Sequence, residues 1–170
     1  KQDFATSILT IANSLDPEFL IVEPTGVAKL GNIINNIRQI EYERIILLKP
    51  ITVIDGNSFD SFISSYDNIY IDQLVNASKI IISKMESKDK EESEELIKKI
   101  ENLLIKNNVS LDSVEILKEH YSKKNKDWWE NILKSFLDEK YSIKVKSEES
   151  EEIPDSISMK GCKLENENQF

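Results

Sequence analysis

Cysteine and histidine are nearly absent from this sequence, and their scarcity excludes a class of site. The 170 residues include one cysteine, Cys162, and one histidine, His120. A single cysteine cannot form an intrachain disulfide, and these two residues cannot supply the four ligands of a structural zinc centre. We therefore expect a cytoplasmic protein without such a zinc site, in which His120 is a surface residue.

Positive charge is in the minority, and long apolar runs are lacking. The chain has 22 lysine and arginine residues against 31 aspartate and glutamate residues, which gives a formal net charge of −9. Nucleic acids and anionic membranes attract clustered positive charge, so neither is expected as the main partner. No apolar stretch approaches the roughly 20 residues of a membrane-spanning helix. The composition is typical of a soluble protein with no nucleic-acid and no membrane partner.

The length of the chain indicates one domain of ordinary size rather than two. The sequence begins at Lys1 without a methionine and ends at Phe170 within what reads as an unfinished strand or loop. We therefore expect a fragment of a longer polypeptide. The run SEESEE contains no apolar side chain and is typical of a solvated linker. The predicted organisation is a partial main domain over 1–146, an acidic linker over 147–156 and the start of a truncated C-terminal domain over 157–170.

Apolar residues recur at helical spacing in several parts of the chain. Asn57 or Ser58 is expected to cap one of the short helices. The spacing predicts helices over 3–15, from Ala28 to Ile37, around 59–63 and 71–75, within the charged stretch 87–108, and from a cap at Asp127 through Leu137.

Short continuous apolar runs predict β-strands. Runs without polar alternation are typical of strands that are covered on both faces in a parallel sheet. The predicted strands are FLIV at 19–22, ITVI at 51–54, KIII at 79–82 and a weaker one at 114–117. Because helices alternate with these strands, as they do in βαβ units, we expect an α/β fold with a mainly parallel sheet and helices on both faces.

Polar residues follow three of the predicted strands at the point where each strand ends. FLIV leads into Glu23-Pro24-Thr25-Gly26, ITVI into Asp55-Gly56, and KIII into Ser83-Lys84-Met85-Glu86. In open parallel sheets, ligands bind outside the carboxyl ends of the strands. We therefore expect these three groups to meet along one carboxyl edge of the sheet.

The order of these motifs resembles the CobW/HypB/UreG class of P-loop GTPases, and most closely its CobW-like metallochaperone branch. The features that match are a strand with E-x-T-G, a helix, a strand ending in Asp, and then QLVNASKIIISKME at 73–86. The last segment resembles the one that holds the family's guanine-recognition motif, NKxD. The similarity spans roughly residues 1–86, and the tail from Ser156 resembles the opening of the family's C-terminal domain. The resemblance implies a partial Rossmann-like three-layer α/β/α P-loop NTPase domain that uses GTP and Mg²⁺.

The resemblance also implies roles for the E-x-T-G residues. Glu23 would be the catalytic acidic residue of the nucleotide sensor, because a carboxylate there can hold the water shell of Mg²⁺ or orient an attacking water. Gly26 would contact the γ-phosphate through its N–H group, which no Cβ atom obstructs, with Thr25 beside it. The alternative is local, since a threonine before a helix is commonly a turn residue and helix N-cap.

The tetrad after KIII is expected to bind the base. A carboxylate at Glu86 can accept hydrogen bonds from guanine N1–H and N2–H, while the methylenes of Lys84 lie along the base. Ser83 replaces the family's asparagine and Glu86 replaces its aspartate, which leaves GTP or ATP preference open, as well as the alternative of a plain exposed loop. Asp55 matches an aspartate of the family near the nucleotide, and a turn or N-cap role for it is equally open.

A glycine-rich phosphate loop is missing from the sequence. Such proteins need G-x-x-x-x-G-K-[ST], whose amide groups surround the phosphates. None of the four glycines, Gly26, Gly31, Gly56 and Gly161, begins this motif. The resemblance implies that the loop and a cysteine-rich metal motif precede Lys1. We therefore expect the chain alone not to bind a nucleoside triphosphate tightly.

The missing loop also affects the expected sheet. In P-loop proteins of this kind the strand before that loop is central, so a sheet without it exposes apolar edges on the neighbouring strands. We expect one of three outcomes. The missing strand lies in another chain, a second molecule supplies it through strand exchange in a homo-oligomer, or the remaining strands have closed up.

Two hypotheses for function follow. The first is a fragment of a CobW-like, Mg²⁺-dependent GTPase that handles a metal or a cobalamin cofactor, with a client metalloprotein or corrinoid protein as partner. The second is a degenerate nucleotide-fold module that no longer hydrolyses nucleotide and serves as a protein-interaction scaffold. The sequence identifies neither the metal nor the client.

Overall fold

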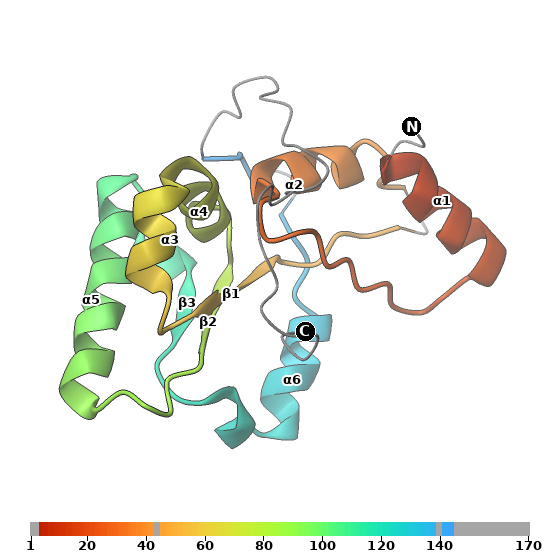
Figure 1. Cartoon of the computed structure of the whole chain (residues 1–170). Helices are drawn as coiled ribbons and strands as arrows, with labels where there is room; N and C mark the ends of the chain where they lie inside the picture. Colours follow the sequence, from red (N-terminus) through yellow and green to blue (C-terminus); the bar gives the residue numbers. More distant parts are fainter. Residues whose placement is uncertain (1–3, 43–44, 139–140, 145–170) are drawn as a thin grey trace, which may run out of the picture.

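The computed structural model describes residues 4–42, 45–138 and 141–144, and Figure 1 shows how their elements are arranged. The predicted acidic linker and the start of a further domain lie outside the described residues. The elements are α1 (Phe4–Leu15), α2 (Leu30–Arg38), β1 (Ile51–Asp55), α3 (Phe59–Ser65), α4 (Asp67–Val75), β2 (Lys79–Ser83), α5 (Lys90–Lys106), the 3₁₀ turn η1 (Leu111–Ser113), β3 (Glu115–Leu117), the 3₁₀ turn η2 (Tyr121–Lys123) and α6 (Lys126–Leu133).

The three strands form one parallel sheet in the order β1-β2-β3. Helices α3 and α4 connect β1 to β2, and α5 connects β2 to β3, so each crossover is helical, as parallel pairing requires. The register places Asp55 opposite Ser83 and Ile81 opposite Leu117. This arrangement confirms the expected α/β fold class and is consistent with a partial Rossmann-like P-loop domain.

The main hydrophobic core lies between one face of the sheet and helices α3, α4 and α5 (Figure 1). Ile54, Ile80 and Ile82 point to this face and are at most 4% exposed. Helix α5 presents Ile100 and Leu104 to them, both fully buried. A capping box starts α5, because Asp89 accepts from the Glu92 N–H group and Glu92 accepts from that of Asp89. The amphipathic stripe predicted within 87–108 is therefore a surface helix that closes the core.

The opposite face of the sheet is only partly covered. Near its amino end, Lys79 and Glu115 form an ion pair, and Trp128 of α6 donates from Nε1 to Glu115 Oε1 at 2.8 Å. Further along β1, Val53 is 63% exposed. The expectation that residues 51–54 are covered on both faces is therefore wrong for β1, because α6 reaches only part of this face.

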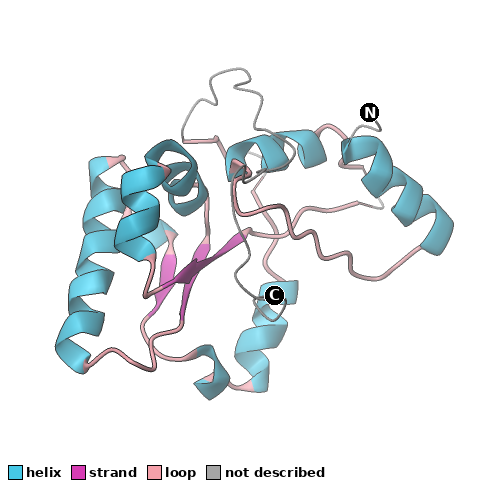
Figure 2. Ribbon diagram, in the orientation of Figure 1, coloured by secondary structure: helices cyan, strands magenta, loops and turns pink. Residues whose placement is uncertain are grey.

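The predicted strand at residues 19–22 is wrong. These residues belong to an irregular segment between α1 and α2, drawn as loop throughout in Figure 2, and Ile21 is 89% exposed. A strand needs a neighbour for its N–H and C=O groups, and within the described ranges no segment pairs with this run. Residues 19–22 therefore do not close the gap left by the missing strand, and among the described residues β1 pairs with β2 alone.

Two predicted helix boundaries also need correction. The cap of α6 is Asn125, whose side chain accepts from the Trp128 N–H group at 3.0 Å, so Asp127 lies inside the first turn instead. The helix ends at Leu133 rather than Leu137, since Phe136 forms a β-bridge with Leu48. None of the helices in the part of the chain that the structure describes is long and apolar enough to cross a membrane.

Helix α5 offers a matched pair of positions to test the core. Replacing Ile100, which is fully buried, with alanine is expected to lower the free energy of unfolding by about 3 kcal/mol, through lost apolar burial and a residual cavity. The same change at Ile105, which is 56% exposed, is expected to alter it by less than about 0.5 kcal/mol. Urea denaturation followed by circular dichroism measures both. Equal losses would contradict this description of the core.

Candidate functional site

The ends of β1 and β2 are joined at the carboxyl edge of the sheet. Lys84 Nζ lies 2.7 Å from Asp55 Oδ2, and the Gly56 N–H group donates to the Ser83 carbonyl at 2.9 Å. The Ser83 hydroxyl donates to the Ile54 carbonyl at 3.0 Å. Lys84 itself has a left-handed backbone, with φ of 57°. Three of the residues predicted for the site, Asp55, Ser83 and Lys84, are therefore neighbours.

The Asp55 carboxylate has two sets of partners. Its Oδ1 atom accepts from the N–H groups of Asn57 and Ser58 at 2.9 and 3.3 Å, in the turn that leads into α3, while Oδ2 faces Lys84. The Lys84 hydrogen bond is the largest of the effects that hold the pKa of Asp55 below its ordinary value of 3.8. The same contact raises the pKa of Lys84. Asp55 therefore stabilises the turn and carries a negative charge at neutral pH.

Glu86, the fourth predicted member of this edge, faces a histidine that the sequence did not associate with it. Glu86 Oε1 lies 3.3 Å from His120 Nε2. On the other side of the ring, the Ser122 N–H group donates to His120 Nδ1 at 3.3 Å. His120 follows β3, and no local pattern marks it as a partner of residue 86. Only the pairing of β3 with β2 brings the two together.

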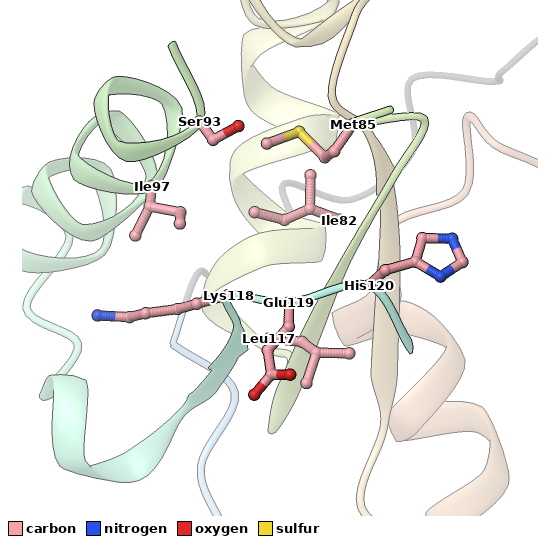
Figure 3. Close-up of a pocket in the computed structure, with 8 residues that line it drawn as sticks. All are labelled: Ile82, Met85, Ser93, Ile97, Leu117, Lys118, Glu119 and His120. Carbon is pink, nitrogen blue, oxygen red and sulfur yellow. The ribbon is translucent and has the colours of Figure 1, made fainter. Parts of the chain in front are cut away.

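A small cavity lies beside this edge, between the ends of β2 and β3 and the start of α5 (Figure 3). Its volume is about 60 Å³, which is far below the roughly 300 Å³ of a small-molecule pocket. Figure 3 shows apolar side chains facing its interior, while Lys118 and His120 point away from it. In this conformation a base can lie only over the rim. The lining residues are Ile82, Met85, Ser93, Ile97, Leu117, Lys118, Glu119 and His120.

The E-x-T-G residues lie elsewhere, against helix α4. Gln73 of α4 donates from Nε2 to the carbonyls of Gly26 and Ala28 at 2.9 and 2.8 Å. The Gln73 carbonyl in turn accepts from the Thr52 hydroxyl at 2.7 Å, in the first half of β1. The segment that contains Gly26 and Ala28 therefore lies beside the amino-terminal half of β1 in space, on the side where α2 is found (Figure 1).

Glu23, Thr25 and Gly26 thus form a second group, separate from Asp55, Ser83 and Lys84, instead of the single edge expected from the sequence. The separation has a physical cause, because residues 19–22 do not form the strand that would have carried Glu23 to the sheet. Thr25 is not the N-cap of α2, since Lys29 occupies that position without a side-chain cap bond. The turn interpretation of Thr25 does hold, as its carbonyl accepts from the Ala28 N–H group at 2.9 Å.

The described ranges contain no group of three or more histidine, cysteine, aspartate or glutamate side chains that could hold a metal ion. A transition-metal centre, which needs several such ligands, does not fit these residues. Mg²⁺ in nucleotide sites has a smaller requirement, because one or two carboxylates and the phosphates hold it together with water. Glu23 has an exposed carboxylate three residues before Gly26, and such a side chain is chemically suited to this role.

The partners of Asp55 predict a measurable effect on its pKa. Replacing Lys84 with methionine is expected to raise the pKa of Asp55 toward 3.8, while the two N–H groups keep it somewhat depressed. Because the folded pKa is depressed, the stability that Asp55 contributes is complete above 3.8 and is lost as the pH falls through the folded pKa. An NMR titration of the Asp55 carboxyl carbon measures the shift.

Lys90→Met is the matched control, since Lys90 is a fully exposed lysine that pairs with Glu94 rather than with Asp55. It should leave the titration of Asp55 unchanged. If Lys84→Met also leaves it unchanged, the ion pair at this edge does not exist in solution.

Comparison with known proteins adds one finding to this geometry. The family model described as CobW/HypB/UreG, nucleotide-binding domain, matches residues 1–110. No curated protein and no solved structure matches the chain. The matched range covers 110 of the 170 residues and contains both groups of candidate residues, from Glu23 to Glu86. The chain therefore belongs to the CobW/HypB/UreG family of GTP-binding proteins.

Proposed function

We propose that this chain is part of a CobW-like, Mg²⁺-dependent GTPase of the cytoplasm that handles a metal or a cobalamin cofactor. Family membership over residues 1–110 supports the GTP-binding class. The observation that carries the finer proposal is the meeting of Asp55 and Lys84 where β1 and β2 end, with Glu86 two residues further along the chain, facing His120. Such an edge of a parallel sheet is where nucleotides bind in open α/β folds.

In the proposed site the base lies over the rim at β2 and β3. The Glu86 carboxylate, 69% exposed, accepts hydrogen bonds from guanine N1–H and N2–H and gives up its contact with His120. The methylenes of Lys84 cover one face of the base. Ser83 cannot take over all hydrogen bonds of an asparagine, since its hydroxyl already donates to Ile54. Glu86 therefore carries most of the selectivity for guanine.

Gly26 is proposed to contact the phosphates, for which the segment that carries it would have to lie at the carboxyl edge with Asp55 rather than beside the amino-terminal half of β1. Apart from the glycine and its two chain neighbours, no atom comes within 4 Å of where a Cβ atom on Gly26 would stand, so the space on that side of the residue is open. Glu23 is proposed to orient the attacking water, and Mg²⁺, when bound, would neutralise charge on the phosphates. Because the sequence contains no G-x-x-x-x-G-K-[ST] motif, we infer that a phosphate loop outside the 170 residues completes the site.

A metal, in this proposal, is the cargo of the protein. The described residues offer no ligand set for it, so its ligands and the contact with a client metalloprotein or corrinoid protein would come from other parts of the protein. The proposed contribution of this chain is the energy of nucleotide binding and hydrolysis, which would change the affinity for cargo or client.

A second function is favoured by one specific observation. Lys84 is already paired with Asp55, and Glu86 already faces His120, so both base-binding side chains have partners within the chain. A nucleotide-fold module that had lost hydrolysis, and that now serves as a scaffold for protein interaction, would look the same. The two functions differ in whether the protein responds to GTP.

Thermal unfolding of the full-length protein with Mg²⁺ and either GTP, ATP or no nucleotide distinguishes the two functions. A ligand at one hundred times its dissociation constant stabilises the folded state by about 2.7 kcal/mol, so GTP is expected to raise the melting temperature by several degrees and ATP by much less. The 170-residue chain alone should show no shift. Equal melting temperatures of the full-length protein with and without GTP would favour the scaffold.

Two substitutions in the full-length protein test the residue assignments. Glu86→Gln removes the charge from the proposed base contact and is expected to weaken GDP binding by about tenfold or more, since hydrogen bonds to charged groups contribute roughly 1.5 to 3 kcal/mol. Glu94→Gln, on an exposed position of α5, is the control and should have no effect.

Glu23→Gln in the full-length protein should lower the rate of GTP hydrolysis much more than the affinity for GTP. Unaltered hydrolysis would remove Glu23 from the mechanism.

A further inference from the structure

Consecutive residues of helix α4 hold the segment that follows the E-x-T-G residues. Gln73 donates to the carbonyls of Gly26 and Ala28, and Asp72 Oδ2 accepts from the Gly31 N–H group at 3.0 Å. The contacts span the whole turn between Gly26 and the first residues of α2. The position of this turn is therefore set by side chains of α4 rather than by bonds within the turn alone.

Asp72 is an aspartate in a place where aspartates are rare, because it is 0% exposed. Burial raises its pKa, and the N–H groups of Gly31 and Leu30 act in the opposite direction. Gly31 makes this contact possible, since a Cβ atom there would lie 3.0 Å from Asp72 Oδ1 and 2.8 Å from a methyl group of Ile143. The start of α2, α4 and the segment 141–144 thus pack together without intervening space.

The same face of α4 also binds the C-terminal part of the described chain. Asn76, likewise 0% exposed, donates from Nδ2 to Asp72 Oδ1 at 3.2 Å. Its own Oδ1 atom accepts from the Tyr141 hydroxyl at 3.2 Å and from the Lys144 N–H group at 3.1 Å. At the other end of α2, Arg38 donates to the carbonyls of Asp138 and Tyr141. Helix α2 is therefore tied to this segment at both of its ends.

We name Asp72, Gln73 and Asn76 the α4 clasp. We propose that the clasp positions the E-x-T-G segment and, through Asn76 and Tyr141, couples the placement of that segment to residues 141–144. Asp72 and Gln73 are in this view positioning residues, since they act on Gly26 and Gly31 rather than on a ligand. The relevance of this coupling to nucleotide binding rests on the proposed function, but the coupling itself does not.

The physical basis of the coupling is that Asp72 and Asn76 are fully buried and that, among the described residues, no buried side-chain N or O atom is left without a hydrogen-bond partner. The Asn76 amide joins Asp72 to Tyr141, and the Tyr141 hydroxyl lies within hydrogen-bond distance of both the backbone carbonyl and Oδ1 of Asn76. Its loss therefore leaves both acceptors with fewer donors and weakens the hold on the amide. Leu74 and Val75, both 1% exposed, fix the helix itself in the core. A change at 141–144 is therefore transmitted by side-chain reorientation and not by unfolding of α4.

Hydrogen exchange of the 170-residue chain tests the coupling without any nucleotide. Tyr141→Phe is expected to speed exchange of the Gly31 amide by about tenfold, with no change in β2 or α5, since local opening rather than global unfolding is involved. Gln73→Ala should speed exchange both at 26–31 and at 141–144. Tyr121→Phe, at an exposed tyrosine, is the control. Together, Gln73→Ala and Tyr141→Phe should have non-additive effects.

Three results would overturn the coupling. The first is a Tyr141→Phe effect confined to 141–144, the second is strict additivity of the two substitutions, and the third is faster exchange throughout the chain. The last result would show that Tyr141 has a general structural role instead. Asp72→Asn keeps one acceptor oxygen but turns an NH₂ group toward the Asn76 amide, so it should speed exchange at Gly31, and unaltered protection there would also contradict the clasp.

The full-length protein separates this inference from the proposed function. If GTP slows exchange at 26–31 and at 141–144, and Tyr141→Phe abolishes only the second effect, both proposals are supported. Slower exchange at 26–31 alone would overturn the coupling and leave the nucleotide site standing. If GTP changes nothing in any part, the proposed function fails, and the comparison without nucleotide still decides whether the clasp couples the two segments.

Discussion

The parallel pairing of β1 with β2 is the constraint on which the rest of the structure depends. Its register sets Asp55 opposite Ser83, so the next residue, Lys84, can reach the Asp55 carboxylate. The same pairing orients α4 antiparallel to both strands, with one face in the core and its polar face toward residues 26–31. A shift of one residue would reverse the faces of β2 and disrupt both arrangements.

Much of the fold could be predicted from the sequence, because the helices have apolar residues at helical spacing and the three strands are short apolar runs. The strand at 79–82 is the clearest example, as Ile80, Ile81 and Ile82 are buried and the strand is paired on both sides. Residues 19–22 have an equally apolar pattern, yet they form no strand. An apolar run indicates that its residues favour burial. Whether the run pairs as a strand depends on a neighbouring strand, and the local pattern carries no information about that neighbour.

In the candidate site, too, features that follow from the local sequence could be predicted, whereas features that depend on distant neighbours could not. Asp55 and the tetrad could be predicted because they directly follow strands whose order the fold class fixes. The pairing of Glu86 with His120 could not, because it joins residues 34 positions apart through β3. Asp72 and Asn76 resemble ordinary polar residues of a surface helix in the sequence. Their burial arises only where α2 and residues 141–144 meet α4.

The backbone at Lys84 has one more implication. Among the described residues, Asp16, Lys84 and Asn108 are the non-glycine positions with positive φ, and aspartate and asparagine tolerate this conformation better than other side chains do. Lysine has no such tolerance, and a glycine at this position would relieve the steric conflict. The chain thus accepts local backbone strain immediately after β2, at the residue whose side chain reaches the Asp55 carboxylate.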